Sequence, residues 1–229
     1  MTWLANLYKT YEENTHVIGK FEKKYNEQEY ALIPVSHTTQ TAHIEVALDG
    51  EGEFMFAKVI DKKEANTIIP CTEASANRTS APAPYPLFDK LIYVAGDFTK
   101  YGGAVKRGTP HADYLNQLQS WCESQYAHPK VISVYKYLYK GRLIEDLVRE
   151  KVIVVDEENR MIEKWTGAVA EKYGDKPPIF QVLSGEQTSA FVRFTVNIPG
   201  DVEPRLWRDK TVQESFIAFY NERLGDEDL

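Results

Sequence analysis

Two short polar segments carry the side chains best suited to contacting a nucleic acid. One is Ser36-His37-Thr38-Thr39-Gln40, and the other is Asn77-Arg78-Thr79-Ser80. Amides and guanidinium groups are the usual bidentate readers of base edges, and hydroxyl groups contact phosphate oxygens. Ser, Thr and Asn also satisfy backbone groups in turns, and composition alone favours that structural role for both segments.

A glycine-containing basic segment follows at residues 99–108. Its cations are Lys100, Lys106 and Arg107, which suit phosphate steering because a flexible loop can track a backbone without fixed register. The chain as a whole has 27 Lys and Arg against 34 Asp and Glu, and this net charge of −7 argues against a general nucleic-acid binder. Between residues 74 and 112, however, the only acidic residues are Asp89 and Asp97, so a local basic surface is compatible with an acidic protein.

A metal-assisted hydrolase is a second interpretation of the polar residues. His37 and His43, six positions apart, could hold a divalent ion together with Glu45 or Asp97. If residues 41–48 form a strand, His43 and Glu45 lie on its solvent side, and nothing in the pattern brings His37 beside them. Exposed or hydrogen-bonded polar residues are the simpler explanation. The chain has two cysteines, too few for a thiolate zinc site, and we expect neither a metal nor another cofactor.

The segments that must position these side chains show strand and helix periodicity in turn. Apolar and polar residues alternate at 42–48 and 190–198, which predicts half-buried strands, and the turn residues at 49–52 predict a returning strand over 54–60. Three prolines exclude a regular helix from 72–86, so the second polar segment lies in a loop. Further strands are expected at 151–155 and 179–183, and helices at 2–13, 87–95, 111–126, 129–139, 142–150 and 209–222, the last capped by Asp209.

The order of these elements, strands followed by helices and then strands again, predicts an α+β fold with a mainly antiparallel sheet and packed helices. We expect a strand-rich region at 1–98, a helical region at 110–150 and a second strand-rich region at 151–229. No apolar run approaches the roughly 20 residues of a membrane span, and the N-terminus lacks the basic and apolar segments of a signal peptide. The sequence therefore predicts a soluble, cytoplasmic protein with no membrane partner.

Several long strings are similar to the large subunit of the type I-C CRISPR Cascade. They are Leu32–Val46, Thr67–Glu73, Asn77–Ser80, Leu91–Phe98 and Val192–Asp209. The resemblance extends over nearly the whole chain. Members of that family are typically more than twice as long and end in a helical region, so the resemblance implies that residues 1–229 correspond to the N-terminal domain of a truncated large subunit.

That resemblance implies a non-catalytic DNA-recognition subunit. In RNA-guided complexes the guide RNA reads the target sequence by base pairing, while protein contacts a short flanking motif on the duplex before the strands separate. The implied partners are double-stranded target DNA, the guide RNA complex with its Cascade backbone subunits, and a helicase–nuclease that the complex recruits. A protein-only scaffold that faces a basic partner is a third interpretation.

The resemblance makes the second polar segment the first candidate for contacting the flanking motif. Arg78 would reach a phosphate or a base edge, Asn77 a base edge, and Thr79 and Ser80 the DNA backbone. Other candidates are Lys100, Lys106 and Arg107 for phosphate steering, and His37, Thr39 and Gln40 as weaker contacts. His37 and Gln40 alternatively stabilise the first sheet.

Overall fold

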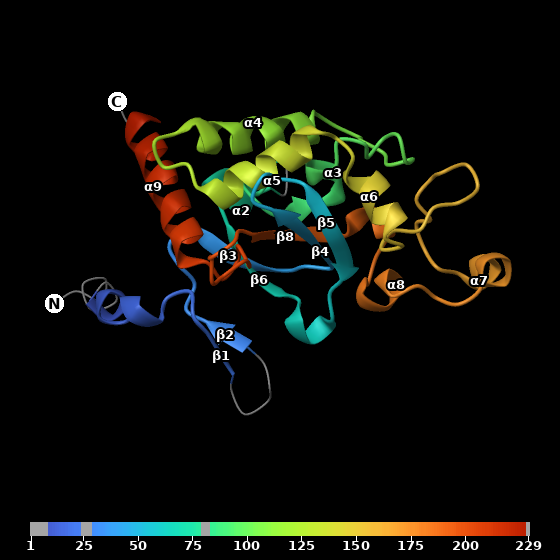
Figure 1. Ribbon diagram of the computed structural model, residues 1–229, viewed down its shortest axis with the longest axis horizontal. Coiled ribbons are helices and arrows are strands. Elements are labelled where there is room, and N and C mark those ends of the chain that lie inside the picture. Colours follow the sequence, from blue (N-terminus) through green and yellow to red (C-terminus); the bar gives the residue numbers. More distant parts are fainter. Residues whose placement is uncertain (1–8, 24–28, 79–82, 228–229) are drawn as a thin grey trace.

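The computed structural model describes residues 9–23, 29–78 and 83–227 (Figure 1). The strands are β1 (Phe21–Lys23), β2 (Glu29–Ala31), β3 (His37–Thr41), β4 (Ile44–Asp49), β5 (Phe54–Val59), β6 (Asn66–Pro70), β7 (Asp89–Lys90) and β8 (Phe191–Asn197). The α-helices are α2 (Glu73–Ala76), α3 (Leu91–Val94), α4 (Pro110–Glu123), α5 (Pro129–Tyr139), α6 (Leu143–Arg149), α7 (Gly167–Tyr173), α8 (Ile179–Val182) and α9 (Lys210–Glu227). Short 3-10 helices are η1 (Thr15–Val17), η2 (Lys62–Glu64) and η3 (Gln187–Ser189).

A four-stranded sheet with the order β5-β4-β8-β7 forms the centre of the molecule. β4 is antiparallel to β5 and parallel to β8, and β7 is antiparallel to β8. The turn between β4 and β5 is closed by Asp49, whose carboxylate accepts the N–H groups of Glu51 and Glu53. Gly52 in this turn has a φ of +80°, which disfavours any residue with a Cβ atom. The predicted hairpin is confirmed.

A second ladder extends from this hairpin. β3 pairs with β6 in antiparallel register, with Thr39 opposite Ile68. Because β4 and β5 lie between β3 and β6 in the sequence, the two pairs are successive parts of one long folded-back ribbon. Backbone hydrogen bonds from Ala42 to Ala65 and from Ile60 to His43 connect them.

The two central strands are buried on both faces, which the alternating sequence pattern did not predict. In β4, Ile44, Val46 and Leu48 face α5, but Glu45 on the opposite face is only 7% exposed. It is covered because Arg193 of β8 lies opposite it and forms an ion pair with its carboxylate at 2.7 Å. The expectation that Glu45 faces solvent is therefore wrong.

Helices α4 and α5 lie together above the sheet, and α9 flanks it on the left in Figure 1. The fully buried Trp121 of α4 joins these layers, because its ring contacts Phe216 and Phe219 of α9 at 5.2 and 6.2 Å between centroids. Its indole N–H also donates to Ser215 at 3.0 Å. The buried hydrophobic residues form one cluster that extends from Ala42 to Phe219.

A buried lysine fixes the start of α9. Lys130 of α5 is 1% exposed, and its ammonium group donates to Asp209 at 2.5 Å, to Asp201 at 2.6 Å and to the carbonyl of Glu203 at 2.6 Å. Burial alone would lower the pKa of Lys130, but its hydrogen bonds to the two carboxylates raise it. Asp209 also accepts the N–H of Thr211, as expected of the residue that caps this helix.

The α+β class and the mainly antiparallel pairing are confirmed. The helix predicted at 129–139 has those bounds, whereas two predicted strands are wrong. Residues 179–183 instead form the short helix α8, preceded by two prolines that suit the start of a helix. At 151–155, Lys151 has a φ of +58° and only Val155 makes a bridge, to Met161.

Region 151–229 therefore contains a single strand, β8, among its described residues, rather than the predicted strand-rich region. Near the N-terminus, residues 9–13 are helical as predicted, while the rest of the predicted helix, 2–8, lies outside the described residues. No helix in the described ranges is both long enough and apolar enough to cross a membrane.

Candidate nucleic-acid interface

Arg78, the first sequence candidate, lies at the base of the loop that follows α2. Its Nη1 and Nη2 atoms donate to the two carboxylate oxygens of Asp89 at 2.8 and 3.1 Å. Nη1 also donates to the carbonyl of Ala83 at 3.1 Å. The guanidinium lies over the rings of Tyr85 and Tyr93, 4.0 and 5.1 Å from their centroids. These contacts fix Arg78 against the protein on several sides.

Asp89 explains why this arginine is held so firmly. Its side chain is fully buried, and it also accepts the backbone N–H groups of Tyr85 and Lys90, each at 2.7 Å. Burial raises the pKa of the carboxyl group, and the hydrogen bonds and charge of Arg78 oppose that rise. A charged group this deep must be paired, so Asp89 requires Arg78.

Arg78 thus has a structural role that the sequence did not indicate. By bonding both to Ala83 and to Asp89, it closes the ends of the 79–82 segment. Its side chain keeps 18% exposure, and its contact with DNA stays a prediction. Thr79 and Ser80 lie outside the described residues.

Of the three weaker candidates on β3, Thr39 lies opposite Ile68 of β6, and the other two contact protein groups through their side chains. Gln40 donates to the hydroxyl of Tyr85 at 3.3 Å, which places it beside the ring under Arg78. The Nδ1 atom of His37 is 2.8 Å from the carbonyl of Val35, and its ring meets Phe216 edge to face at 5.7 Å. Burial lowers the pKa of His37 to about 4, so it is neutral near pH 7. These contacts support the alternative that His37 and Gln40 stabilise the first sheet.

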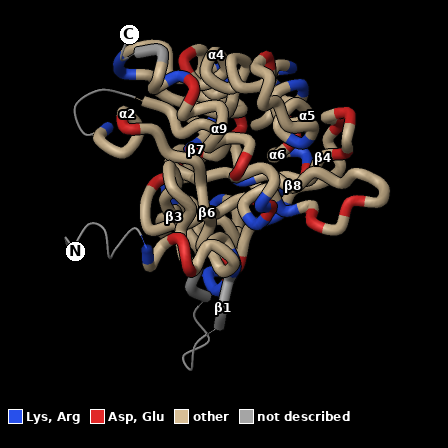
Figure 2. The backbone as a smooth tube through the Cα atoms, turned by 90° about the vertical axis from the view of Figure 1, so that its left-hand side faces the viewer, with Lys and Arg blue, Asp and Glu red and all other residues tan. Residues whose placement is uncertain are grey.

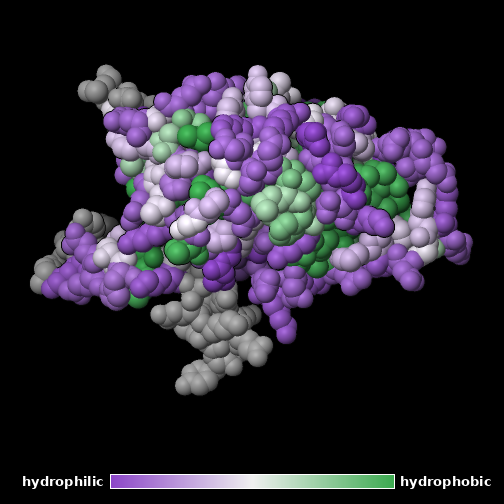
Figure 3. Space-filling view, in the orientation of Figure 1, coloured by the Kyte–Doolittle hydropathy of each residue, from purple (hydrophilic) through white to green (hydrophobic). Residues whose placement is uncertain are grey.

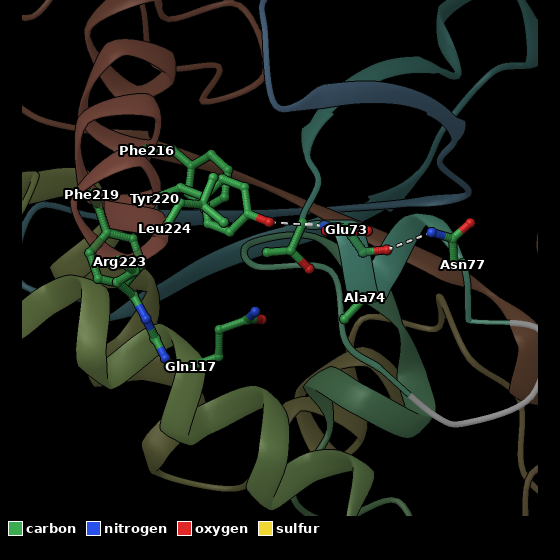
Figure 4. Close-up of a pocket in the computed structure, with 10 residues that line it drawn as sticks. Glu73, Ala74, Asn77, Gln117, Phe216, Phe219, Tyr220, Arg223 and Leu224 are labelled. Atoms are coloured by element: carbon green, nitrogen blue, oxygen red, sulfur yellow. Dashed lines mark hydrogen bonds between the residues drawn. The ribbon is translucent and has the colours of Figure 1, made fainter. Parts of the chain in front are cut away.

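Asn77 is exposed and borders a cavity of about 490 Å³ between α2, α4 and α9 (Figure 4). Its amide donates to the carbonyl of Glu73 at 3.2 Å, and the N–H of Glu73 donates to the hydroxyl of Tyr220 at 3.0 Å. In Figure 4 the amide of Gln117 points from α4 into the space, whereas the Asn77 amide lies at its edge and is turned toward the carbonyl of Glu73. Asn77 is therefore an exposed residue at the end of α2.

The basic segment 99–108 forms an exposed loop before α4. Lys106 and Arg107 are exposed and make no hydrogen bond or ion pair with any residue of the described ranges. Lys100 lies 3.9 Å from Glu145 of α6 and above the ring of Tyr101. The start of the loop is held by Phe98, since a Cβ atom on Gly103 would lie 2.4 Å from its ring. As predicted, residues 99–108 form neither a helix nor a strand, and the phosphate contacts of this loop stay a prediction.

The structure does not join all the candidates into one surface. Gln40, Asn77 and Arg78 gather where β3 and α2 meet, whereas the 99–108 loop extends from the opposite end of α4 (Figure 1). Lys, Arg, Asp and Glu are interspersed along the chain in Figure 2, so no half of the molecule is uniformly basic. Any contact with an anionic duplex must therefore depend on local cations.

The residues considered for a metal site are apart and individually engaged. His43 accepts the N–H of Phe191 at 3.0 Å, Glu45 pairs with Arg193, and Asp97 accepts the N–H groups of Ile144 and Glu145 at the start of α6. Within the part of the chain that the structure describes, no three His, Cys, Asp or Glu side chains gather as metal ligands would.

Sequence reasoning missed one group of cations. Lys140, Arg142 and Arg149 line a second cavity, of about 340 Å³, at the end of α5 and along α6. Arg142 and Arg149 flank Asp146 at helical spacings of four and three residues, a pattern that places all three on one face. That spacing is the sequence signal from which this group of cations could have been identified.

Replacing Arg78 with Met should lower the free energy of unfolding by about 3 kcal/mol, because Asp89 would remain buried without its partner. The matched control is Asn77→Ala at the neighbouring exposed position, which should change stability by no more than about 0.5 kcal/mol. Urea unfolding of the two variants makes the comparison. Equal stabilities would show that Arg78 does not anchor the loop.

Acid should weaken the fold through His37. The unfolded histidine binds a proton near pH 6.5 and the folded one only near pH 4, so stability is lost as the pH falls through this interval. The shift corresponds to at most about 3 kcal/mol. The variant His37→Phe should lose correspondingly less between pH 6.5 and pH 4 in urea unfolding. Parallel pH curves for the two proteins would contradict the buried, neutral His37.

Comparison with known proteins now identifies the family. Residues 7–228 match the family model described as CRISPR-associated protein (Cas_Csd1), a range that includes all the candidate residues. A comparison with curated proteins found no match. The match agrees with the resemblance of the strings between Leu32 and Asp209. The chain belongs to the Csd1 family of CRISPR-associated proteins and is a Cascade-type subunit.

Proposed function

We propose that this protein is a non-catalytic DNA-recognition subunit of a type I-C RNA-guided surveillance complex. It contacts the motif beside the target and supports separation of the target strands. The observation that carries the proposal is the family match over residues 7–228. Its partners are the target duplex, the guide RNA bound to Cascade backbone subunits, and the helicase–nuclease that such a complex recruits.

The geometry supports a division of roles among the candidates. Asn77 is exposed at the end of α2, and its side-chain amide, which donates to the carbonyl of Glu73, is of the type that pairs with base edges. Lys106 and Arg107 are exposed on a glycine-containing loop and offer charge to phosphates without sequence preference. Arg78, next to Asn77, bonds to Ala83 and Asp89 and so has a structural role.

Net charge bears on where such binding takes place. At −7, the chain repels a polyanion at long range, so a few exposed cations give it only weak affinity when it is alone. Within a complex, the guide RNA and the backbone subunits hold the duplex nearby, and local contacts then suffice to read a flanking motif. We therefore expect recognition in the assembled complex rather than by the isolated chain.

The two other interpretations have less support. For a metal-assisted hydrolase, His43, Glu45 and Asp97 would have to leave the protein contacts they now make. A protein-only scaffold has no specific observation in its favour. It would be supported if the assembled complex kept its subunits and its target affinity when every candidate side chain was replaced.

The proposal is tested by target binding of the assembled complex at several salt concentrations. Asn77→Ala should weaken binding roughly tenfold to targets with the correct flanking motif and leave other duplexes unaffected. Lys106→Ala with Arg107→Ala should weaken binding to all duplexes and reduce the log–log salt slope by roughly two. Arg78 is omitted because its replacement alters stability.

The control variant, Lys62→Ala with Lys63→Ala on η2, removes two positive charges, as the Lys106–Arg107 variant does, but at a different place. Both lysines are exposed, and we expect this variant to bind targets as the wild type does. Target binding that is unchanged in both the Asn77 and the Lys106–Arg107 variants would reject the proposed DNA contacts.

A further inference from the structure

The cavity at the end of α5 has the composition of a phosphate site. Its volume is about 340 Å³, and three of its lining side chains are cationic while one is acidic. Figure 3 shows hydrophilic surface over the region where α5 meets α6. The lining residues are Glu53, Phe54, Tyr137, Lys140, Arg142 and Arg149.

One buried carboxylate orients the two arginines. Asp146 is fully buried; it accepts from Arg142 at 3.0 Å and forms an ion pair with Arg149 at 2.8 Å. The hydroxyl of Tyr137 donates to the same carboxylate at 2.9 Å. The side chains of Arg142 and Arg149 remain nearly half exposed, at 45% and 49%. Asp146 therefore neutralises one positive charge and holds both planar groups in place, which reduces the entropy lost when a ligand binds them.

The third cation faces an acidic partner that can move. Lys140 donates to the side chain of Glu53 at 2.7 Å and to the carbonyl of Gly52 at 3.1 Å. Glu53 is 68% exposed, and an exposed pair of this kind contributes at most about 1 kcal/mol. An incoming anion can therefore displace Glu53 and meet three cations, of which Asp146 compensates one.

The cavity adjoins the basic loop already assigned to phosphate contacts. The turn between α5 and α6 touches the backbone just before that loop, since a Cβ atom on Gly96 would lie 2.9 Å from the Cα of Gly141. Asp97 caps α6, and Lys100 lies beside Glu145 of the same helix. A strand that follows the 99–108 loop thus meets the α5–α6 turn next.

We propose that Lys140, Arg142 and Arg149 bind a phosphate group of a nucleic-acid strand, which continues a path that begins at the 99–108 loop. The proposal rests on the proposed function, because it takes the strand from the target duplex. Guanidinium groups suit this ligand, since their planar forks match two phosphate oxygens at once.

The test measures duplex binding by the assembled complex for Lys140→Gln and Arg149→Gln. In Arg149→Gln, Asp146 keeps Arg142 and Tyr137, and Lys140 does not contact Asp146, so thermal unfolding should show both variants folded. Each should weaken binding roughly threefold to tenfold and reduce the salt slope by about one. The charge-matched control is Lys63→Gln on η2, which should bind as the wild type does.

Three results would overturn the proposal, and they differ in whether they also reject the proposed function. In the first result, both cavity variants bind duplexes with wild-type affinity and salt slope, while replacing Lys106 and Arg107 weakens binding. This result would reject the cavity as a phosphate site and would not affect the proposed function. No effect from either set, with unchanged binding also in Asn77→Ala, would reject both. Arg149-dependent binding of inorganic pyrophosphate to the full chain, without any change in duplex binding, would show that the cavity takes a free phosphate compound instead of a strand.

Discussion

The buried carboxylate of Asp89 is the constraint on which the candidate region depends. With no exposed surface, it is stable as an anion only because Arg78 and the N–H groups of Tyr85 and Lys90 bond to it. This interaction joins Arg78, at the end of α2, to Ala83 and to β7, the strand that pairs with β8. Similar buried pairs act elsewhere: Lys130 holds the start of α9, and Arg193 joins β8 to β4.

Periodicity predicted much of the fold because the signals were local. In α5, proline at the first position and apolar residues at helical spacing are sufficient to define the helix. The strand predicted at 179–183 was wrong because a short apolar run has no period, and the preceding prolines favoured a helix start. The half-buried interpretation of β4 was wrong because the partner of Glu45 is Arg193, which is 148 residues away in the sequence.

The accessibility of the candidate residues could be predicted from the sequence better than their roles could. Glycines and neighbouring cations predicted a flexible basic loop at 99–108, and Lys106 and Arg107 are exposed in it. The same reasoning could not separate a DNA contact from a structural contact at Arg78, because that distinction depends on the burial of Asp89 and the stacking of two tyrosines. Arg142 and Arg149 were overlooked because charged residues at helical spacing usually form solvated faces, whereas here they surround a buried acid.

The central claim is that exposed cations of the 99–108 loop meet the duplex, whereas the Arg78–Asp89 pair has a structural role. Hydrogen exchange of the assembled complex, measured with and without a matching target duplex, tests this most directly. The account predicts slower exchange of the amides at 99–108 when the duplex is present. It also predicts unchanged exchange at 85–91, where the amides of Tyr85, Lys90 and Leu91 already bond within the protein. Unchanged exchange at 99–108, with new protection at 85–91, would contradict it.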